Sequence, residues 1–477
     1  MMDERLELER GGRGPSFLER ITAPHTYAIL FFLAVLAVIG TWLLPAGEFD
    51  RVLNEAVGRN VVVPGTFKAV EQTPVSFFGL FTAYMEGFIE GADVVGFVFF
   101  AYTSWYVVLR TKALHAAVGA MLRVFGENQR RYIMPFFLFV FGFCASIFGM
   151  FEESFGFLPL FVGMAIAMGY DGMVGAATVA VGVGMGYSAA IMNPFTVILA
   201  QKCAELPLLS GWPFRLVLSL SFFAVSALYI ARYAARVKAD PTQSLLHGVD
   251  MGELHMDHDE LVSMKFTLRY KLVCLICLGA VGVLMWGVIA QGWYFNELGA
   301  LFVLMGILGG MVGGLGVNGT AKAFADGFCD IAAGCLLIAF GRTMLVILQK
   351  GHIIDTVAYY CSLPLSVLPK WLAAEGMLVV QNLINFFIPS GSGQAVVTMP
   401  IMAPLADLLG ISRQVAVLAF QFGDGLSNVM WPTADIPIIC AIAHIPLNKW
   451  YKFFLPLFGI GLLMQAIGIA AAVLLGL

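Results

Sequence analysis

Along this chain, long apolar stretches alternate with short polar segments, and their lengths predict helices that cross a membrane. About 20 consecutive apolar residues span the hydrocarbon core of a bilayer as a helix. Stretches of this kind lie at residues 26–46, 93–109, 173–200, 213–236, 271–291, 298–317, 328–348, 412–444 and 452–476. The pattern therefore predicts an all-α polytopic membrane protein.

Four regions depart from simple spans in a way that predicts broken helices and hairpins. The stretches 173–200 and 412–444 are overlong and are interrupted near their middles by Gly, Asn and Pro. The apolar regions 132–169 and 373–409 are too long for one crossing, too short for two with a loop, and polar at their centres. Irregular backbone at membrane depth is tolerated only where it faces protein or a water-filled cavity. We therefore expect two re-entrant hairpins, each followed by a broken helix.

The two halves of the chain are related by an internal repeat. Residues 83–112 can be laid over 323–352 at an offset of 240, which places Arg110 on Lys350. At an offset of 239, the first-half residues Gly184, Gly186 and Ser188 fall on Gly423, Gly425 and Ser427. The matched spans 93–109 and 328–348 cross in opposite directions in the topology below. We therefore predict an inverted repeat, which gives two near-equivalent arrangements of one structure and so a basis for alternating access.

Lysine and arginine predict the orientation, because cytoplasmic loops carry an excess of both. With the N-terminus in the cytoplasm, 18 of these residues fall inside and eight outside. The C-terminus then lies outside, and one hairpin enters from each face. The expected parts are a cytoplasmic tail at 1–25, a first half at 26–236 with the cytoplasmic-side hairpin, a cytoplasmic linker at 237–266, and a second half at 267–477 with the outside hairpin.

Composition narrows the class of protein further. The chain is 60% hydrophobic and 12% charged, which excludes a soluble monomer because one core could not bury so much apolar surface. The net charge of −4 says little about partners. The expected partners are a small-molecule substrate and the lipid bilayer, with no nucleic acid. The scattered cysteines, including Cys274 and Cys277, are interpreted as buried structural thiols.

Three connecting segments carry smaller expectations. The linker histidines His255 and His258 could form a metal site, but a solvated linker is the favoured interpretation. The stretch 113–125 is predicted as a short helix at the membrane interface with Arg123 in the headgroups. The segment 47–75 is expected to be an exposed connector.

The candidate binding residues lie in or beside the breaks. Half-helix N-termini offer NH groups to a carboxylate, and freed carbonyls suit Na⁺ or an ammonium group. The candidate substrate-binding residues are Glu152, Glu153, Ser154, Asn193, Arg342, Ser390, Gly391, Ser392, Gly393, Asp424, Asn428 and Thr433. The candidate coupling-ion ligands are Glu153, Ser188, Asn193, Ser427, Asn428, Asp424 and Asp435. The alternative is that the small polar residues only cap broken helix ends.

The acids are the more specific signal, because an ionisable group at membrane depth costs about 2.5 kcal/mol or more. Glu152 and Glu153 are adjacent, and one of them is expected to carry a coupling proton. Arg342 can grip a carboxylate through two hydrogen bonds or neutralise a site glutamate. The alternative is that a glutamate simply pairs with Arg342, or that Asp435 lies near water and is structural. The excess of acids favours a cationic or zwitterionic substrate.

Other classes of protein find less support. The chain has no HExxH, no GxSxG and no paired histidines within a span, so an enzyme is not expected. A channel does not need an inverted pair of hairpins. No cofactor is expected apart from Na⁺ or H⁺ as a coupling ion. On the rising arm of the second hairpin, Gln381, Asn382 and Asn385 suit interhelical hydrogen bonding as well as substrate contact.

Several stretches together resemble a known family. They are PHTYAIL…LLPAGEFDR (24–51), GMFEESFGFLPLFVGMAIAMGYD (149–171), NPFTVILAQ (193–201), IPSGSGQAVVTMPIMAPL (388–405) and FGDGLSNVMWPT (422–433). They are similar to the YfcC family, which is related to DcuC/ArcD-like carriers within the ion-transporter superfamily. The resemblance implies a secondary transporter of the prokaryotic inner membrane that forms a homodimer. It also implies a scaffold domain and an elevator-like transport domain that holds both hairpins.

The resemblance also implies a substrate class. Members of the family are often labelled basic amino acid antiporters, whereas related groups carry dicarboxylates, short-chain fatty acids or aminobenzoyl-glutamate. Superfamily members commonly use Ser-Asn-Thr at each hairpin tip for Na⁺, but this chain has Glu-Glu-Ser at one tip and Ser-Gly-Ser at the other. The departure favours proton coupling or exchange. We therefore expect a basic amino acid carrier, with a Na⁺- or H⁺-coupled C4-dicarboxylate carrier as the alternative.

Overall fold

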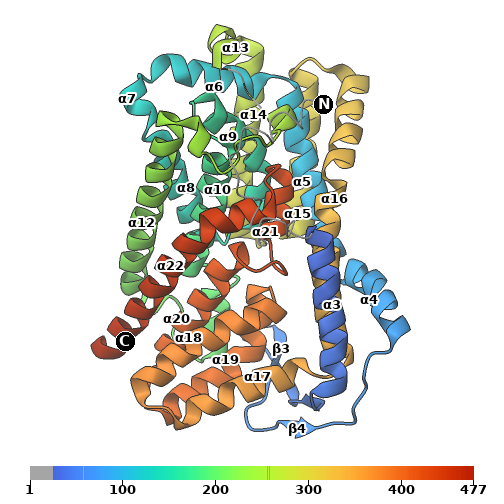
Figure 1. The fold of residues 1–477 in the computed structure, drawn as a ribbon, viewed down its shortest axis with the longest axis vertical. Coiled ribbons are helices and arrows are strands. Elements are labelled where there is room, and N and C mark those ends of the chain that lie inside the picture. The colour runs from blue at the N-terminus through green and yellow to red at the C-terminus, as the bar shows by residue number, and fades with distance from the viewer. Residues whose placement is uncertain (1–24, 57, 255, 257) are drawn as a thin grey trace, which may run out of the picture.

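The computed structural model describes residues 25–56, 58–254, 256 and 258–477, and this part of the chain is mostly helical (Figure 1). Seven of its helices are long and apolar enough to cross a membrane. They are α3 (Thr26–Leu43), α5 (Ala92–Arg110), α12 (Trp212–Ala239), α14 (Leu268–Gln291), α15 (Phe295–Val312), α16 (Gly316–Lys350) and α22 (Leu447–Leu475). The predicted helical, multi-span character is confirmed.

Shorter helices fill the regions for which the sequence predicts hairpins and broken helices. In the first half these are α8 (Ile133–Phe148), the 3₁₀ segment η1 (Glu152–Phe157), α9 (Leu158–Ala167), α10 (Gly172–Ser188) and α11 (Val197–Cys203). In the second half they are α18 (Lys370–Phe387), α19 (Gly391–Leu408), α20 (Arg413–Gly425), η5 (Leu426–Val429) and α21 (Ile436–Ile442). The helices α8, α9 and α10 lie in the upper half of Figure 1, and α18 to α20 lie in the lower half. The short helix α11 packs against α19 and α20.

The remaining helices connect or cover these groups. They are α4 (Phe77–Glu90), α6 (Ala113–Val124), α7 (Glu127–Arg130), α13 (His258–Ser263) and α17 (Ile354–Ser362), with short 3₁₀ turns η2 (Pro241–Gln243), η3 (Gly252–Leu254) and η4 (Leu363–Val367). The long helix α16 packs against α3, α4, α5 and α21. It therefore contacts helices from both the first and the second half of the chain.

The connector at 47–75 is not simply an exposed loop. It forms two small antiparallel sheets, which pair β1 (Gly47–Glu48) with β4 (Lys68–Ala69) and β2 (Arg51–Asn54) with β3 (Arg59–Val62). The all-α prediction missed these strands, whose short lengths leave little pattern to detect. Asp355 of α17 fastens the connector, because it accepts hydrogen bonds from the amide of Phe49 and from Arg51.

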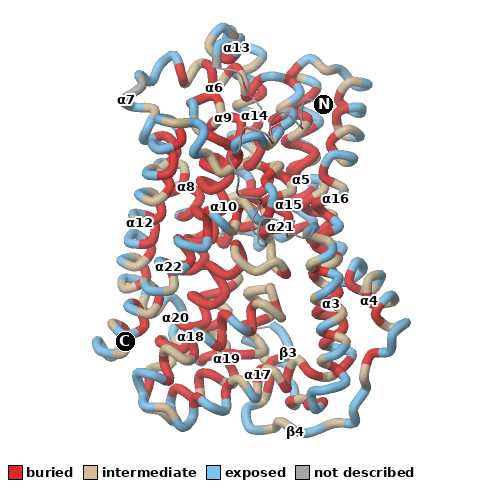
Figure 2. Tube along the Cα trace, viewed as in Figure 1, coloured by how far each residue is buried: buried red, intermediate tan, exposed pale blue. Residues whose placement is uncertain are grey.

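The centre of the molecule is formed by α10, in which every residue is buried (Figure 2). Glycines let the neighbouring backbones approach closely. A Cβ on Gly186 would lie 2.2 Å from the carbonyl oxygen of Gly142, and one on Gly425 would lie 2.1 Å from the amide nitrogen of Ser188. The two broken helices thus meet backbone to backbone at the point where α10 ends.

The linker at 237–266 is more ordered than the expected solvated segment. Leu246, Met251, Leu254, Met256 and Leu261 are buried, so the expectation of a solvated linker was wrong for this part of the chain. The predicted short helix at 113–125 is present as α6, but α13 and α14 pack against it.

Two details of these segments can be compared with expectation. Arg123 donates hydrogen bonds to the carbonyls of Val262 and Met264 instead of projecting freely. His255, one of the two histidines considered as metal ligands, lies outside the described residues. No cluster of three or more metal-ligating side chains occurs among the residues that were described.

Candidate functional site

The tip of the first hairpin is η1, which carries the paired glutamates. α8 ends at Phe148, and the next residue, Gly149, has a φ of 74°. A Cβ there would also lie 2.7 Å from Asn193 Oδ1, so both features favour glycine. The carboxylate of Glu153 accepts a hydrogen bond of 3.0 Å from the amide of Phe151. Ser154 donates to the carbonyl of Phe151 at 2.6 Å. The Ser154 hydroxyl and one carboxylate oxygen of Glu153 are therefore both hydrogen-bonded within this turn.

The break after α10 is tied to the end of α8. Asn193 accepts from the amide of Phe195 at 2.9 Å and donates to the carbonyl of Ala145 at 3.3 Å. Ser188 accepts a hydrogen bond of 2.8 Å from the side chain of Gln465. In this arrangement Asn193 and Ser188 stabilise the break through hydrogen bonds within the protein. This agrees with the alternative that the small polar residues cap the broken helix ends.

The second hairpin and its broken helix share a buried hydrogen-bond network. Asn385 donates to Gln394 and to Asp424 Oδ1, both at 3.2 Å, and accepts from Ser427 at 2.7 Å. Gln394 in turn donates to Gln381 at 2.7 Å. Asn385 and Gln381 therefore act between helices, and Gln394 is a member of this network that the sequence did not single out.

Three oxygens near the second hairpin tip have no partner within the part of the chain that the structure describes. They are Asp424 Oδ2, Asn428 Oδ1 and Thr196 Oγ1. Asp424 and Thr196 both lie against Gly391, since a Cβ there would be 2.7 Å from Asp424 Oδ2 and 2.6 Å from Thr196 Cγ2. Unpaired buried oxygens are costly, and such a group calls for a ligand, a proton or water.

A cavity of about 270 Å³ lies where these pieces converge. Both hairpin tips, the two breaks, the α4–α5 turn, α15, α16 and β3 contribute to its wall. Its polar lining residues are Arg59, Glu90, Asp93, Glu152, Glu153, Tyr187, Thr196, Tyr294, Arg342, Ser390, Ser392, Asn428 and Asp435. Five carboxylates thus face two guanidinium groups, and the cavity carries an excess of acidic groups.

The predicted site residues divide into those that line this cavity and those behind it. Lining it are Glu152, Glu153, Arg342, Ser390, Gly391, Ser392, Asn428 and Asp435. Buried behind it are Ser154, Ser188, Asn193, Asp424, Ser427 and Thr433. Thr433 donates to the carbonyl of Phe386 at 2.8 Å, and Gly393 lines a neighbouring cavity.

Three charged residues of the cavity wall were missed by the sequence reasoning. Glu90 and Asp93 flank the turn between α4 and α5, where carboxylates beside a span were a usable signal. Arg59 comes from β3 and donates a hydrogen bond of 3.0 Å to Ser392 at the tip of the second hairpin. No sequence pattern links these two residues, which are 333 positions apart.

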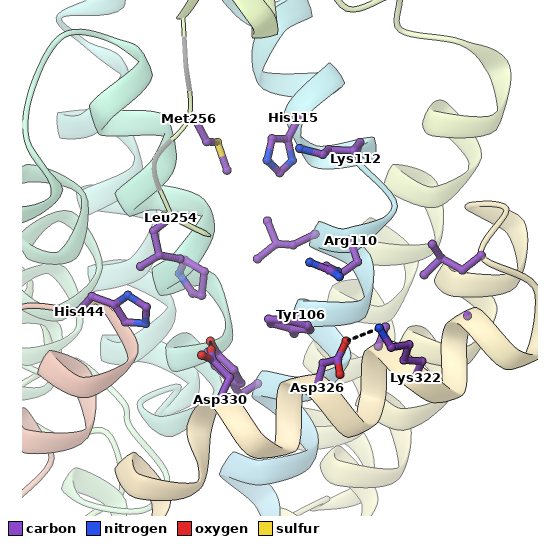
Figure 3. Close-up of a pocket in the computed structure, with 16 residues that line it drawn as sticks. Tyr106, Arg110, Lys112, His115, Leu254, Met256, Lys322, Asp326, Asp330 and His444 are labelled. Atoms are coloured by element: carbon purple, nitrogen blue, oxygen red, sulfur yellow. Dashed lines mark hydrogen bonds and ion pairs between the residues drawn. The ribbon is translucent and has the colours of Figure 1, made fainter. Parts of the chain in front are cut away.

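Two of the other cavities among the described residues are also larger than the central one. A cavity of about 420 Å³ next to the connector shares Glu90, Arg342 and Ser390 with the central cavity, so the two adjoin each other on the strand side. A cavity of about 650 Å³ lies between α5, α16 and the linker, and shares none of the central lining residues (Figure 3). In the wall of the 650 Å³ cavity, Tyr102 of α5 donates a hydrogen bond to Asp330 of α16.

Comparison with known proteins assigns the family. A family model described as "DcuC: C4-dicarboxylate anaerobic carrier" matches residues 23–474. The chain belongs to the DcuC family. Together with its seven apolar helices, membership in the DcuC family makes it a multi-pass membrane protein and a secondary transporter.

Individual DcuC relatives agree with this assignment. "Putative basic amino acid antiporter YfcC" of Escherichia coli is 30% identical, over 96% of this chain and 97% of that protein. An uncharacterized protein of Haemophilus influenzae is 28% identical, over 93% of this chain and 96% of its own length. The resemblance to the YfcC group is therefore confirmed.

Two solved structures overlap with the chain more loosely. They are the YdaH transporter of Alcanivorax borkumensis and MtrF of Neisseria gonorrhoeae, with TM-scores of 0.45 and 0.46 and identities of 16% and 17%. The alignments cover 95% of this chain in both cases, with 99% of the YdaH chain and 96% of the MtrF chain. Overlaps of this size do not establish a shared fold.

Proposed function

We propose that this protein carries a basic amino acid across the prokaryotic plasma membrane, by antiport or coupled to a cation. The observation that carries the proposal is the charge of the central cavity, where five carboxylates face two arginines. A low-dielectric site with this excess attracts a substrate that brings positive charge. The name of the Escherichia coli relative points to the same substrate class.

The cavity offers a separate place for each end of an amino acid. Arg59, Ser392 and the N-terminal end of α19 form a positive side for an α-carboxylate, because helix N-termini attract anions. Glu152, Glu153 and Asp435 form the acidic side for an ammonium or guanidinium group. One of the two adjacent glutamates is the proposed carrier of a coupling proton.

The coupling ion is proposed to sit behind the substrate. Asp424 Oδ2 and Asn428 Oδ1 lack partners among the described residues and lie between the second hairpin and its broken helix. Oxygen donors of this kind suit Na⁺ or a proton shared with the carboxylate. No other cofactor is invoked.

The mechanism we propose is alternating access through an inverted repeat. Two pairs of residues related by the repeat share a rare left-handed backbone: Lys112 with His352 (φ 64° and 52°), and Glu205 with His444 (φ 55° and 54°). Their offsets of 240 and 239 equal those of the sequence alignment. These matching backbone conformations support the proposal that the two halves of the chain are structural repeats.

The two outer cavities fit the same proposal. Glu90 lines the cavity on the strand side, and its repeat mate Asp330 lines the cavity on the linker side. Lys112 and His352 are related in the same way. The strand-side cavity then serves as the outer entrance, and the linker-side cavity as the inner exit with the N-terminus in the cytoplasm. Hairpins and broken helices form the moving part of an elevator on a homodimeric scaffold.

A second candidate is a C4-dicarboxylate carrier, which the description of the family model favours. Arg59 and Arg342 can each bind one carboxylate, provided that protons or Na⁺ offset the surrounding acids. Counterflow in proteoliposomes separates the candidates. Arginine or ornithine should exchange with labelled arginine, whereas succinate should not.

Two variants sharpen this test. Glu153→Gln and Asp424→Asn should abolish exchange while the protein stays folded and keeps its oligomeric state. Exchange of succinate alone would replace the proposal by its rival. Wild-type exchange of arginine by both variants would remove the assigned role of the acids.

A further inference from the structure

An apolar cavity of about 430 Å³ separates the first hairpin from α14. Side chains of α5, α6, α8, η1, α9, α14 and α15 line it, and nearly all are aliphatic or aromatic. The lining also includes the thiols of Cys144, Cys274 and Cys277. Water gains few hydrogen bonds in such a space, so an empty or hydrated state would forfeit contacts on every wall.

The cavity opens sideways, toward the surface that faces lipid. Leu278 of α14 belongs to its lining and is 70% exposed. α14 contains a candidate membrane span, and only 22% of the residues in its 18-residue apolar window are buried. It packs on α6 and α15 but meets α8 only marginally, which leaves the gap between α14 and the hairpin open. A hydrocarbon chain can enter there without leaving the bilayer.

Positive charge lies just beyond one end of the cavity, on the helix α14 that lines it. The contribution of α14 runs from Cys274 to Met285, a length of about 16 Å at the rise of an α-helix. One turn before Cys274, the exposed residues Arg269 and Lys271 stand at the start of the helix. An apolar slot that ends at basic residues on the cytoplasmic side matches a lipid tail with an anionic headgroup.

We infer that this cavity binds one acyl chain of an anionic phospholipid, whose phosphate contacts Lys271. The occupant supports the first hairpin from behind. Phe157, next to the tip glutamates, lies in the cavity wall and packs on Trp105 with ring centroids 4.6 Å apart. The inference concerns a surface outside the substrate cavity and does not depend on which substrate is carried.

Native mass spectrometry of the whole protein tests the inference, with dioleoylphosphatidylglycerol and dioleoylphosphatidylcholine as probes. The wild type should retain one phosphatidylglycerol after delipidation and bind phosphatidylcholine more weakly. Val281→Phe fills the slot and should lose the adduct. Leu275→Phe lies on the same helix, 63% exposed and outside the lining, and should keep it.

A charge variant covers the case in which Val281→Phe fails to fold. Lys271→Gln is exposed and should bind phosphatidylglycerol about fivefold more weakly, with phosphatidylcholine unaffected. Equal retention by wild type and both variants would overturn the inference. A photo-crosslinker at Leu278 should capture lipid, and capture of a second copy of the chain would instead assign the cavity to a subunit interface.

Discussion

Replacing Gly391 by alanine tests whether the second hairpin tip must fit closely against the broken helix. Gly391 begins α19, directly after the capping residue Ser390. Its backbone does not lie in the left-handed region, so alanine brings no conformational penalty there. The new methyl group would lie 2.6 Å from Thr196 Cγ2 and 2.7 Å from Asp424 Oδ2. The substitution is therefore a purely steric perturbation of the proposed ion and substrate sites.

The magnitude follows from these two distances. Carbon atoms in good contact stand about 3.5–4.0 Å apart, so both neighbours must move by close to an ångström. Overpacking of this kind costs about 1–3 kcal/mol. If the strain falls on the substrate-bound state, the apparent affinity should drop by about 5- to 150-fold.

Uptake of labelled arginine into proteoliposomes measures the effect, with thermal unfolding recorded beside it. Gly391→Ala should lower the apparent affinity for arginine far more than it lowers the unfolding temperature. Thr196→Ser keeps the hydroxyl but removes Cγ2, so the double variant should recover part of the affinity. Gly459→Ala is the control, because its new methyl group meets nothing within 4 Å.

Two results would refute this reasoning. If Gly391→Ala binds arginine with wild-type affinity, close packing at the second hairpin tip does not affect substrate binding. A double variant no better than Gly391→Ala would mean that Thr196 is not the obstructing neighbour.

Three further substitutions follow from single contacts. Arg59→Gln should lower the apparent affinity for arginine about tenfold but leave that for agmatine unchanged, because agmatine lacks the carboxylate. Equal losses for both compounds in uptake assays would contradict the role assigned to Arg59. Gly425→Ala forces a methyl group onto the backbone of Ser188 and should destabilise by about 3 kcal/mol, measured as an unfolding temperature lower than that of Gly459→Ala. His115 lies on α6, outside the candidate spans, and burial lowers its pKa from 6.5 to about 4. Between these two pH values only the unfolded state takes up the proton, so the free energy of unfolding should fall as the pH drops from 6.5 toward 4. His115→Gln should lose that part of the acid sensitivity in melting curves at pH 7 and pH 5.

The positions of the helices could be predicted from the sequence because hydropathy and helix breakers act locally. The overlong stretch 173–200 is divided between α10 and α11, with Asn193 and Pro194 in the interruption. The strands of the connector escaped prediction, because segments of two to four residues carry no periodicity. The connector that carries them is held by Asp355 of α17, which lies 306 positions after its hydrogen-bond partner Phe49.

The composition of the site could be predicted only in part. The acids of the first hairpin tip stood out because charge inside an apolar region is costly. The roles of Ser188 and Asn193 could not be assigned from the sequence. Each side chain can bind a ligand, or it can form hydrogen bonds to other groups of the protein. Gln465 and Ala145 satisfy them in the structure, and neither partner is visible from spacing. Arg59 was missed for the same reason.

At four left-handed positions the chain keeps a functional side chain although the backbone conformation there is strained. Glycine would be the relaxed choice at Lys112, Glu205, His352 and His444, since left-handed geometry costs other residues about 1–2 kcal/mol. Yet Lys112 and His444 border one outer cavity, His352 borders the other, and Glu205 forms an ion pair with Arg413. Substituting glycine at these positions should therefore stabilise the protein for purification. The same substitutions should slow substrate exchange.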